Sequence, residues 1–334
     1  MTLRTRLSPA AASALQEIQA PVAGALELVL EEMKRIVASE TGLVNSVSEH
    51  LMVMRGKMMR PTLLLLASET EGTREAQAAA YAAVVELIHL ATLVHDDAVD
   101  HSVLRRGMPT INALFSHQVS VIMGDYLYSR ALLELVRLGD LVRLEVLARA
   151  SNELTVGEIR QLAALDALAF SENDYELLIR AKTAALFAAA CEVGALCGAP
   201  KHRQAMRAYG VQLGMAFQVV DDLLDYTESA ATVGKPTGLD LKEHKATLPL
   251  IASLPTMSPN ERAVVSELFN TSEPADDLVA RVIEIVRDQG GLDYARRRGE
   301  EYAERAEEAL GTLPESAGKT ALLDTVAYVM ERRA

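Results

Sequence analysis

The chain has 334 residues, half of them hydrophobic, and its 33 Lys and Arg against 46 Asp and Glu give a net charge of −13. This acidic balance, without a basic stripe, excludes general nucleic-acid binding. The only cysteines, Cys191 and Cys197, lie in an apolar stretch and form neither a disulfide framework nor a CxxC metal site. Residues 2–13 lack the apolar core of a signal peptide, and no apolar run approaches about 18 residues, so we expect a cytoplasmic protein without stable membrane insertion.

Nearly every segment has the apolar spacing of a helix. Hydrophobic residues recur at intervals of three and four, and no Asn-Gly type of turn separates alternating runs, which argues against a sheet. In chain order, the predicted helices are Ala23–Val37, Ala78–Val94, Val119–Leu138, Leu141–Leu165, Tyr175–Cys197, Gln204–Tyr226, Leu278–Asp288 and Leu292–Leu310.

The breaks between these helices are too short to be domain linkers. Ser171 followed by Asp174 predicts a capping box at the start of the helix that carries Lys182. We therefore predict an all-α, single-domain helical bundle over residues 21–334, preceded by a mobile N-terminal segment over residues 1–20. The breaks fall at Arg60-Pro61, Gly107–Pro109, Gly198–Pro200, Gly234–Pro236 and Ser253–Pro259.

Two clusters of three aspartates interrupt apolar helical sequence. Residues four apart share a helix face, so Asp96 and Asp100 lie together, with Asp97 beside them. A solvated acidic turn explains one such cluster as readily as a metal does, but it explains two poorly. Unpaired charge is costly to bury, and grouped carboxylates suit Mg²⁺, which leaves its other positions to water and phosphate oxygens. The second cluster has the same spacing, in Asp221, Asp222 and Asp225.

Cations of the kind that hold phosphate oxygens accompany the aspartates. A single one of them is more often a surface charge, but together with two metal-type clusters they indicate a diphosphate site. These cations are Lys57, Arg60, Arg105, Arg106, Lys182 and Lys235.

The order of these motifs resembles that of trans-prenyl diphosphate synthases, over about residues 20–333. The similarity is greatest to the long-chain members, the hexa- to decaprenyl diphosphate synthases. One departure is Met58-Met59, where the family often has a basic residue after the lysine. The matching segments are Gly56–Pro61, His89–Thr110, Ala181–Ala184, Gly214–Asp225, Gly234–Pro236 and Lys245–Pro249.

The resemblance implies the isoprenoid synthase type of bundle, with a central active-site cavity. It also implies an enzyme that joins isopentenyl diphosphate to an allylic diphosphate (geranyl, farnesyl or geranylgeranyl) and releases pyrophosphate. The six aspartates would hold about three Mg²⁺ ions, for which Mn²⁺ would substitute, and the ions would neutralise the departing pyrophosphate. A homodimer and a role such as quinone side-chain biosynthesis are further implications.

The same resemblance assigns roles to the remaining polar residues. Thr183 and Gln218 would offer oxygen dipoles to the allylic cation, and the released pyrophosphate would take the final proton, with His95 and His101 as alternative bases. The allylic diphosphate would bind Arg105, Lys182, Lys235 and Lys245. The isopentenyl diphosphate would bind Lys57, Arg60, His89 and Arg106.

Product length depends on the space beneath the first cluster. Ala91 lies five residues before Asp96, roughly a turn and a half down the helix, where an aromatic residue would block the growing chain. Alanine there and the neighbouring Thr92 resemble long-chain members and predict a C30–C50 product, with C20–C25 as the alternative. Further down, the depth would be set by residues such as Leu87, Met123 and Leu127.

Three other interpretations remain open. An HD-type metal phosphohydrolase would use His89, His95 and Asp96, but it leaves the second cluster and the lysines unexplained. A non-catalytic partner subunit would be expected to lack some of the aspartates, all six of which are present. A terpene cyclase would lack the bases for isopentenyl diphosphate.

Overall fold

The computed structural model describes residues 9–54, 56–72, 74–163, 167–227 and 238–331. Helices dominate this part of the chain, as predicted, and the strands in it are two residues long. The first half contains α1 (Pro9–Gln19), η1 (Ala20–Val22), α2 (Ala23–Val37), α3 (Gly42–Met54), α4 (Met59–Ser68), α5 (Ala78–Val99), β1 (Leu104–Arg105), β2 (Met108–Pro109), α6 (Ile111–Leu114), α7 (His117–Leu138) and α8 (Leu141–Ala163). The second half contains η2 (Ala167–Ala169), α9 (Glu172–Ile179), η3 (Arg180–Ala184), α10 (Ala185–Leu196), η4 (Pro200–His202), α11 (Arg203–Thr227), α13 (Leu239–Lys242), α14 (Leu248–Ser253), η5 (Leu254–Thr256), α15 (Pro259–Asn270), α16 (Asp276–Asp288), α17 (Gly291–Leu310) and α18 (Ala317–Glu331).

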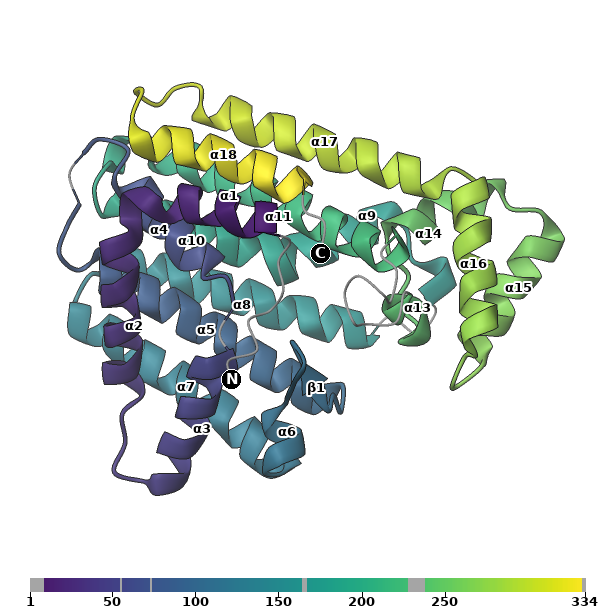
Figure 1. Cartoon of the computed structure of the whole chain (residues 1–334), viewed down its shortest axis with the longest axis horizontal. Coiled ribbons are helices and arrows are strands. Elements are labelled where there is room, and N and C mark those ends of the chain that lie inside the picture. The colour runs from purple at the N-terminus through teal and green to yellow at the C-terminus, as the bar shows by residue number, and fades with distance from the viewer. Residues whose placement is uncertain (1–8, 55, 73, 164–166, 228–237, 332–334) are drawn as a thin grey trace.

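The bundle is built around α4, α5, α10 and α11. Helix α5 packs against α2, α4 and α7, while α10 packs against α4, α8 and α11, and α17 packs along α11. Figure 1 shows α17 and α18 along one side of the bundle, α3, α6 and α7 at the other, and α15 and α16 at one end. The two aspartate clusters lie at the carboxyl ends of α5 and α11.

Small residues let the central helices approach closely. A Cβ added at Gly210 of α11 would come within 2.6 Å of the α10 backbone, and one at Gly214 within 2.6 Å of Ala184 Cα in η3, so both positions require glycine. Helix α5 is buried around most of its surface, and it is the one described helix apolar and long enough to cross a membrane. Because 78% of that window is buried inside the bundle, α5 is explained as a core helix.

Two local departures from the predicted helices matter for the site. The predicted helix Tyr175–Cys197 is divided by η3, a π-helical turn that contains Lys182 and Thr183. Among the described residues, the prediction of no sheet is wrong for one short antiparallel pair, β1–β2. Its turn residues, Arg106 and Gly107, both have positive φ, the geometry usual for Asn-Gly, so the ribbon lacked the expected sequence signal.

Three other expectations of local structure concern the capping box, the cysteines and the N-terminal segment. The capping box is confirmed, since Ser171 and Asp174 exchange side-chain and backbone hydrogen bonds. Both cysteines are free and buried. In the N-terminal segment over residues 1–20, α1 places Leu15 and Ile18 in the core and contacts α18, and the mobility of this segment stays a prediction.

Candidate active site

The first aspartate cluster ends α5, and its three carboxylates have different surroundings. Asp97 is buried and accepts a hydrogen bond from Arg105 Nε at 2.8 Å. Burial, followed by the nearby charge of Glu158, raises the pKa of Asp96 to about 6. Asp100 is exposed beyond the last turn of the helix. Arg105 thus supports one carboxylate, while the other two have oxygens available for a cation.

The second cluster, at the end of α11, is divided in the same way. Asp221 is exposed, whereas Asp222 is only 4% exposed. Asp225 accepts backbone N–H bonds at 3.0 Å from Leu239 and Asp240, so it caps the short helix α13. Burial raises the pKa of Asp225, as expected for a carboxylate without a counter-ion.

Asp222 belongs to a chain of buried hydrogen bonds. Tyr175 on α9 donates its hydroxyl to Asp222 Oδ2 at 2.5 Å, and Gln218 Nε2 donates to Asp222 Oδ1 at 2.8 Å. Thr183 Oγ1 in turn donates to Gln218 Oε1 at 2.7 Å. Burial, followed by the charge of Asp240, raises the pKa of Asp222 well above its ordinary value. The predicted pair Thr183 and Gln218 is therefore brought together, with Tyr175 behind it.

Lys245 lies between the two clusters. Its Nζ is 2.6 Å from Glu243 and 3.9 Å from Asp100 of the first cluster. It also lies near Asp240. Burial and the charge of Asp225 raise the pKa of Asp240 to about 7. The segment that follows the second cluster therefore reaches the first one, and the two clusters border one site.

The helix α8 provides a third wall, which the sequence did not reveal. Lys182 Nζ contacts Glu158 Oε1 at 2.8 Å and Gln161 Oε1 at 2.6 Å. Both partners lie on α8, and the charges of Glu158 and Lys182 act on Asp96. Lys182 is thus placed beside the first cluster, as predicted. The predicted Lys235 lies outside the described residues.

A group of bases around Arg60, His89 and Arg106, called here the basic pocket, lies beside the first aspartate cluster, since the charge of Arg106 acts on Asp97. The guanidinium of Arg60 stacks over the Phe187 ring at 4.7 Å, and burial lowers its pKa to about 10. Arg106 Nη1 donates to Met54 O at 2.8 Å. Burial, with the charges of Arg60 and Arg106, lowers the pKa of His89 well below its usual value, so this imidazole is neutral.

Two more residues complete the basic pocket. Lys57 lies with Nζ 5.7 Å from the centre of the Tyr328 ring, which belongs to α18. Glu86, which the sequence analysis did not single out, is buried within the electrostatic reach of Arg60 and Arg106. All four residues predicted to bind isopentenyl diphosphate therefore lie in one region, with one buried carboxylate to offset their charge.

The residues predicted to control product length lie on α5 and α7, two helices that pack against each other. Leu87, Ala91, Met123 and Leu127 are buried, and Thr92 donates its hydroxyl to the backbone oxygen of His89. A small cavity of about 10 Å³ lies beneath the first cluster, but α3, α5 and the segment 105–111 line it, not α7. The role of Leu87, Ala91, Thr92, Met123 and Leu127 in chain length stays a prediction.

The carboxylates fit divalent cations bound together with a diphosphate. In the described part of the chain, no three His, Cys, Asp or Glu side chains are close enough to hold a metal by themselves. Mg²⁺ rarely needs such a cage, because one or two carboxylates with phosphate oxygens and water complete its octahedron. The half-buried Asp96 and the exposed Asp100 and Asp221 offer that kind of partial coordination.

Comparisons with known proteins agree with this geometry. Residues 41–286 match the family model described as polyprenyl synthetase. The chain is 40% identical over 319 residues to an all-trans-nonaprenyl-diphosphate synthase (geranyl-diphosphate specific) of Rhodobacter capsulatus, covering 95% of this chain and 98% of that protein. It is 36% identical to the octaprenyl diphosphate synthase of Escherichia coli strain K12, covering 93% and 95% of the two chains. A crystal structure of a polyprenyl synthase from Caulobacter crescentus CB15, complexed with calcium and isoprenyl diphosphate, superposes with a TM-score of 0.90 at 34% identity, covering 96% and 98%.

Proposed function

Because the chain belongs to the polyprenyl synthetase family, we propose that it is a trans-prenyltransferase that joins isopentenyl diphosphate to an allylic diphosphate and releases pyrophosphate. One observation carries this proposal: a group of bases that includes no aspartate of either cluster lies beside the first cluster, where the charge of Arg106 acts on Asp97, while Lys245 links the two clusters through its 3.9 Å approach to Asp100. A reaction between two diphosphates needs one binding region for each, here the aspartate clusters and the basic pocket. A phosphohydrolase or a terpene cyclase leaves the basic pocket without a ligand.

The aspartate half is proposed to bind the allylic diphosphate with Mg²⁺. Asp96, Asp100, Asp221 and Asp225 would hold about three ions, which Mn²⁺ would replace. Bound ions would act as Lewis acids on the leaving pyrophosphate. Arg105 is held in position by Asp97, and Lys182 would exchange its contacts on α8 for a phosphate oxygen.

The basic pocket is proposed to bind isopentenyl diphosphate without metal. Arg60 and Arg106 present guanidinium forks, which suit phosphate oxygens. His89, neutral in this surrounding, would donate one N–H without adding charge. The released pyrophosphate is proposed to take the final proton. His95 is a poor alternative, because its imidazole faces Val121 O and Asp125 on α7.

We further propose a C30–C50 product. The nona- and octaprenyl synthases among the relatives support this length, and Ala91 keeps the α5 position beneath the first cluster small. Purified protein, Mg²⁺, farnesyl diphosphate and labelled isopentenyl diphosphate test the reaction, with chromatographic sizing of the products. Products at C20–C25 would favour the alternative length. The absence of any product longer than C15 would refute the long-chain proposal. Turnover by this chain alone would exclude a non-catalytic partner subunit.

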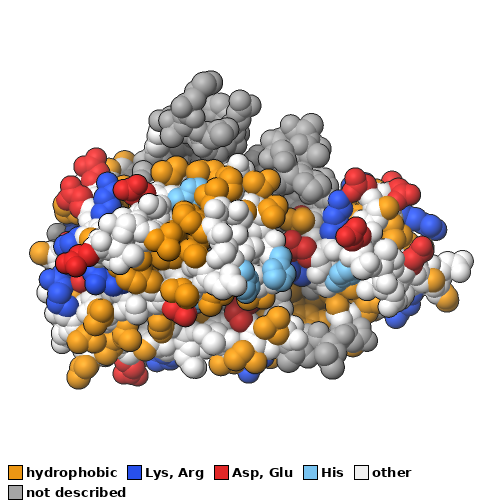
Figure 2. Space-filling view, turned by 90° about the horizontal axis from the view of Figure 1, so that it is seen from below, with side chains coloured by type: hydrophobic (Ala, Val, Ile, Leu, Met, Phe, Trp, Pro, Cys, Tyr) orange, Lys and Arg blue, Asp and Glu red, His pale blue; other side chains and the backbone are white. Residues whose placement is uncertain are grey.

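The assembly is proposed to be a homodimer through α7. This helix exposes an apolar stripe in which Ile122, Leu133 and Val136 are each at least 60% exposed. Figure 2 views the face that includes α7 and shows apolar side chains spread across it. A second copy would cover this stripe with an identical one, the usual arrangement in two-fold dimers. We also propose a cytoplasmic location, without stable membrane insertion.

A further inference from the structure

Behind the second aspartate cluster, a hydrogen-bond chain joins three helical segments. It runs from Tyr175 on α9 to Asp222 and Gln218 on α11, and then to Thr183 in the π-turn η3. Tyr175, Asp222 and Thr183 are buried, and both oxygens of Asp222 accept a hydrogen bond within this chain. Asp222 therefore has a different environment from the exposed Asp221, although the two are adjacent in sequence.

The chain has a definite direction, and Tyr175 sets it. A tyrosine hydroxyl has one proton to donate, and here its acceptor is Asp222. With one carboxylate oxygen so occupied, the amide NH₂ of Gln218 donates to the other. The amide oxygen must then turn toward Thr183, which gives its own proton to that oxygen. Both lone pairs of the threonine oxygen are left for another partner.

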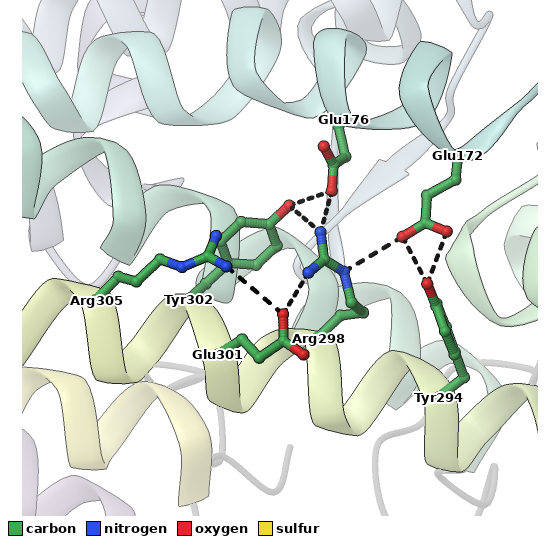
Figure 3. A network of polar contacts seen from close by, with 7 residues as sticks. All are labelled: Glu172, Glu176, Tyr294, Arg298, Glu301, Tyr302 and Arg305. Atoms are coloured by element: carbon green, nitrogen blue, oxygen red, sulfur yellow. Dashed lines mark hydrogen bonds and ion pairs between the residues drawn. The ribbon is translucent and has the colours of Figure 1, made fainter.

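Helix α17 holds the tyrosine's helix in place. Glu172 and Glu176 precede and follow Tyr175 in the sequence. Figure 3 shows that side chains of α17 contact both carboxylates. Arg298 pairs with both carboxylates. Tyr294 donates to Glu172 at 2.8 Å, and Tyr302 donates to Glu176 at 2.6 Å. Because this network fixes α9 on one face, the neighbouring face can present a hydroxyl at a set position against α11.

We propose that Tyr175 is a positioning residue of the prenyl transfer: it holds Asp222, and through it orients the oxygens of Gln218 and Thr183 toward the developing allylic cation. This inference rests on the proposed function. Fixed dipoles stabilise a developing charge because they need not reorganise during the reaction. Asp222 is buried and holds two side-chain hydrogen bonds, so it then serves orientation, and cation binding in the second cluster falls to the more exposed Asp221 and Asp225.

The test compares Tyr175→Phe with Tyr209→Phe. Tyr209 is a matched control, because it is also buried, lies on α11 and donates its hydroxyl to Leu322 O at 2.8 Å, far from the site chain. Three quantities are measured in each variant and in wild type. They are the single-turnover rate of condensation, the affinity for Mg²⁺ with the unreactive farnesyl thiolodiphosphate by calorimetry, and Tm.

We expect Tyr175→Phe to slow the single-turnover rate by about tenfold or more, while the analogue affinity stays at the wild-type value. Tyr209→Phe should lower Tm about as much as Tyr175→Phe does, but it should leave the single-turnover rate unchanged. Equal rates in the two variants would overturn the proposal. An equally large loss of analogue affinity in Tyr175→Phe would also overturn it, because the tyrosine would then act through metal binding. A wild-type protein without prenyl transfer would refute the proposed function itself, and this inference with it.

Discussion

Gly56 lies directly against the guanidinium of Arg106, and this contact allows a sharp test of the basic pocket. A Cβ at position 56 would come within 2.6 Å of Arg106 Nη2 and 2.8 Å of its Cζ, whereas ordinary contacts begin at 3.4 Å. The three heavy atoms nearest to that Cβ all belong to the Arg106 guanidinium, so alanine meets this side chain first. The obstructing atoms lie at the end of the flexible Arg106 side chain. We therefore expect the Gly56→Ala variant to fold normally, with the guanidinium of Arg106 displaced.

The size of the effect follows from what the guanidinium would hold. A hydrogen bond to a charged group contributes roughly 1.5–3 kcal/mol, which corresponds to about 10–100-fold in affinity. Displacement by roughly 1 Å removes the alignment of such a bond. We therefore expect Gly56→Ala to raise the KM for isopentenyl diphosphate by about tenfold or more, with little change in the KM for the allylic substrate.

The assay varies isopentenyl diphosphate at saturating farnesyl diphosphate and Mg²⁺. Gly24→Ala is the matched control, since a Cβ at this α2 position meets nothing within 4 Å. Circular dichroism and Tm verify that both variants fold. An unchanged isopentenyl KM in folded Gly56→Ala would refute the assignment of Arg106, and an equal rise in the control would show that the effect is not local.

Three further changes test other parts of the site. Ala91→Phe fills a buried α5 position and should shift products below C30 on chromatography, so unchanged product length would refute its role. The pKa of Asp96 is raised from 3.8 to about 6, so this group disfavours the folded, metal-free state as pH rises through that interval. Metal-free Asp96→Asn should therefore have a higher Tm than wild type at about pH 7.5, with no difference below about pH 4, and equal Tm values at both would contradict the shift. Ile122→Glu with Leu133→Glu should convert the proposed dimer to a monomer in light scattering, and a persistent dimer would exclude the α7 stripe.

The helices and the two aspartate clusters could be predicted from the sequence, because each is encoded by residues close together in the chain. The three- and four-residue spacing of α5 and α11 is continuous, and each aspartate triplet lies within one turn and a half of its helix. The capping box at Ser171 is equally local. Such features need no knowledge of tertiary contacts.

The partners of the clusters could not be predicted, because tertiary packing brings them from distant segments. Glu158 reaches Lys182 from α8, and Tyr175 reaches Asp222 across 47 residues. Neither stands in a motif that differs from ordinary helical sequence. The π-turn η3 had one usable signal, since Lys182 interrupts an apolar face, but a single charge does not distinguish a π-turn from a regular helix.

The supporting contacts indicate how the site is prepared before substrate arrives. Asp97 and Asp222 are buried and hydrogen-bonded, so their positions are fixed by the protein. Asp100 and Asp221 are exposed, and Lys182 is held by two side chains of α8 that a phosphate oxygen would have to replace. Each cluster therefore combines one buried carboxylate that hydrogen bonds fix within the protein with at least one carboxylate that is exposed to solvent. Under the proposed function, the buried members would orient the site, and the exposed ones would bind the cations that accompany the diphosphate.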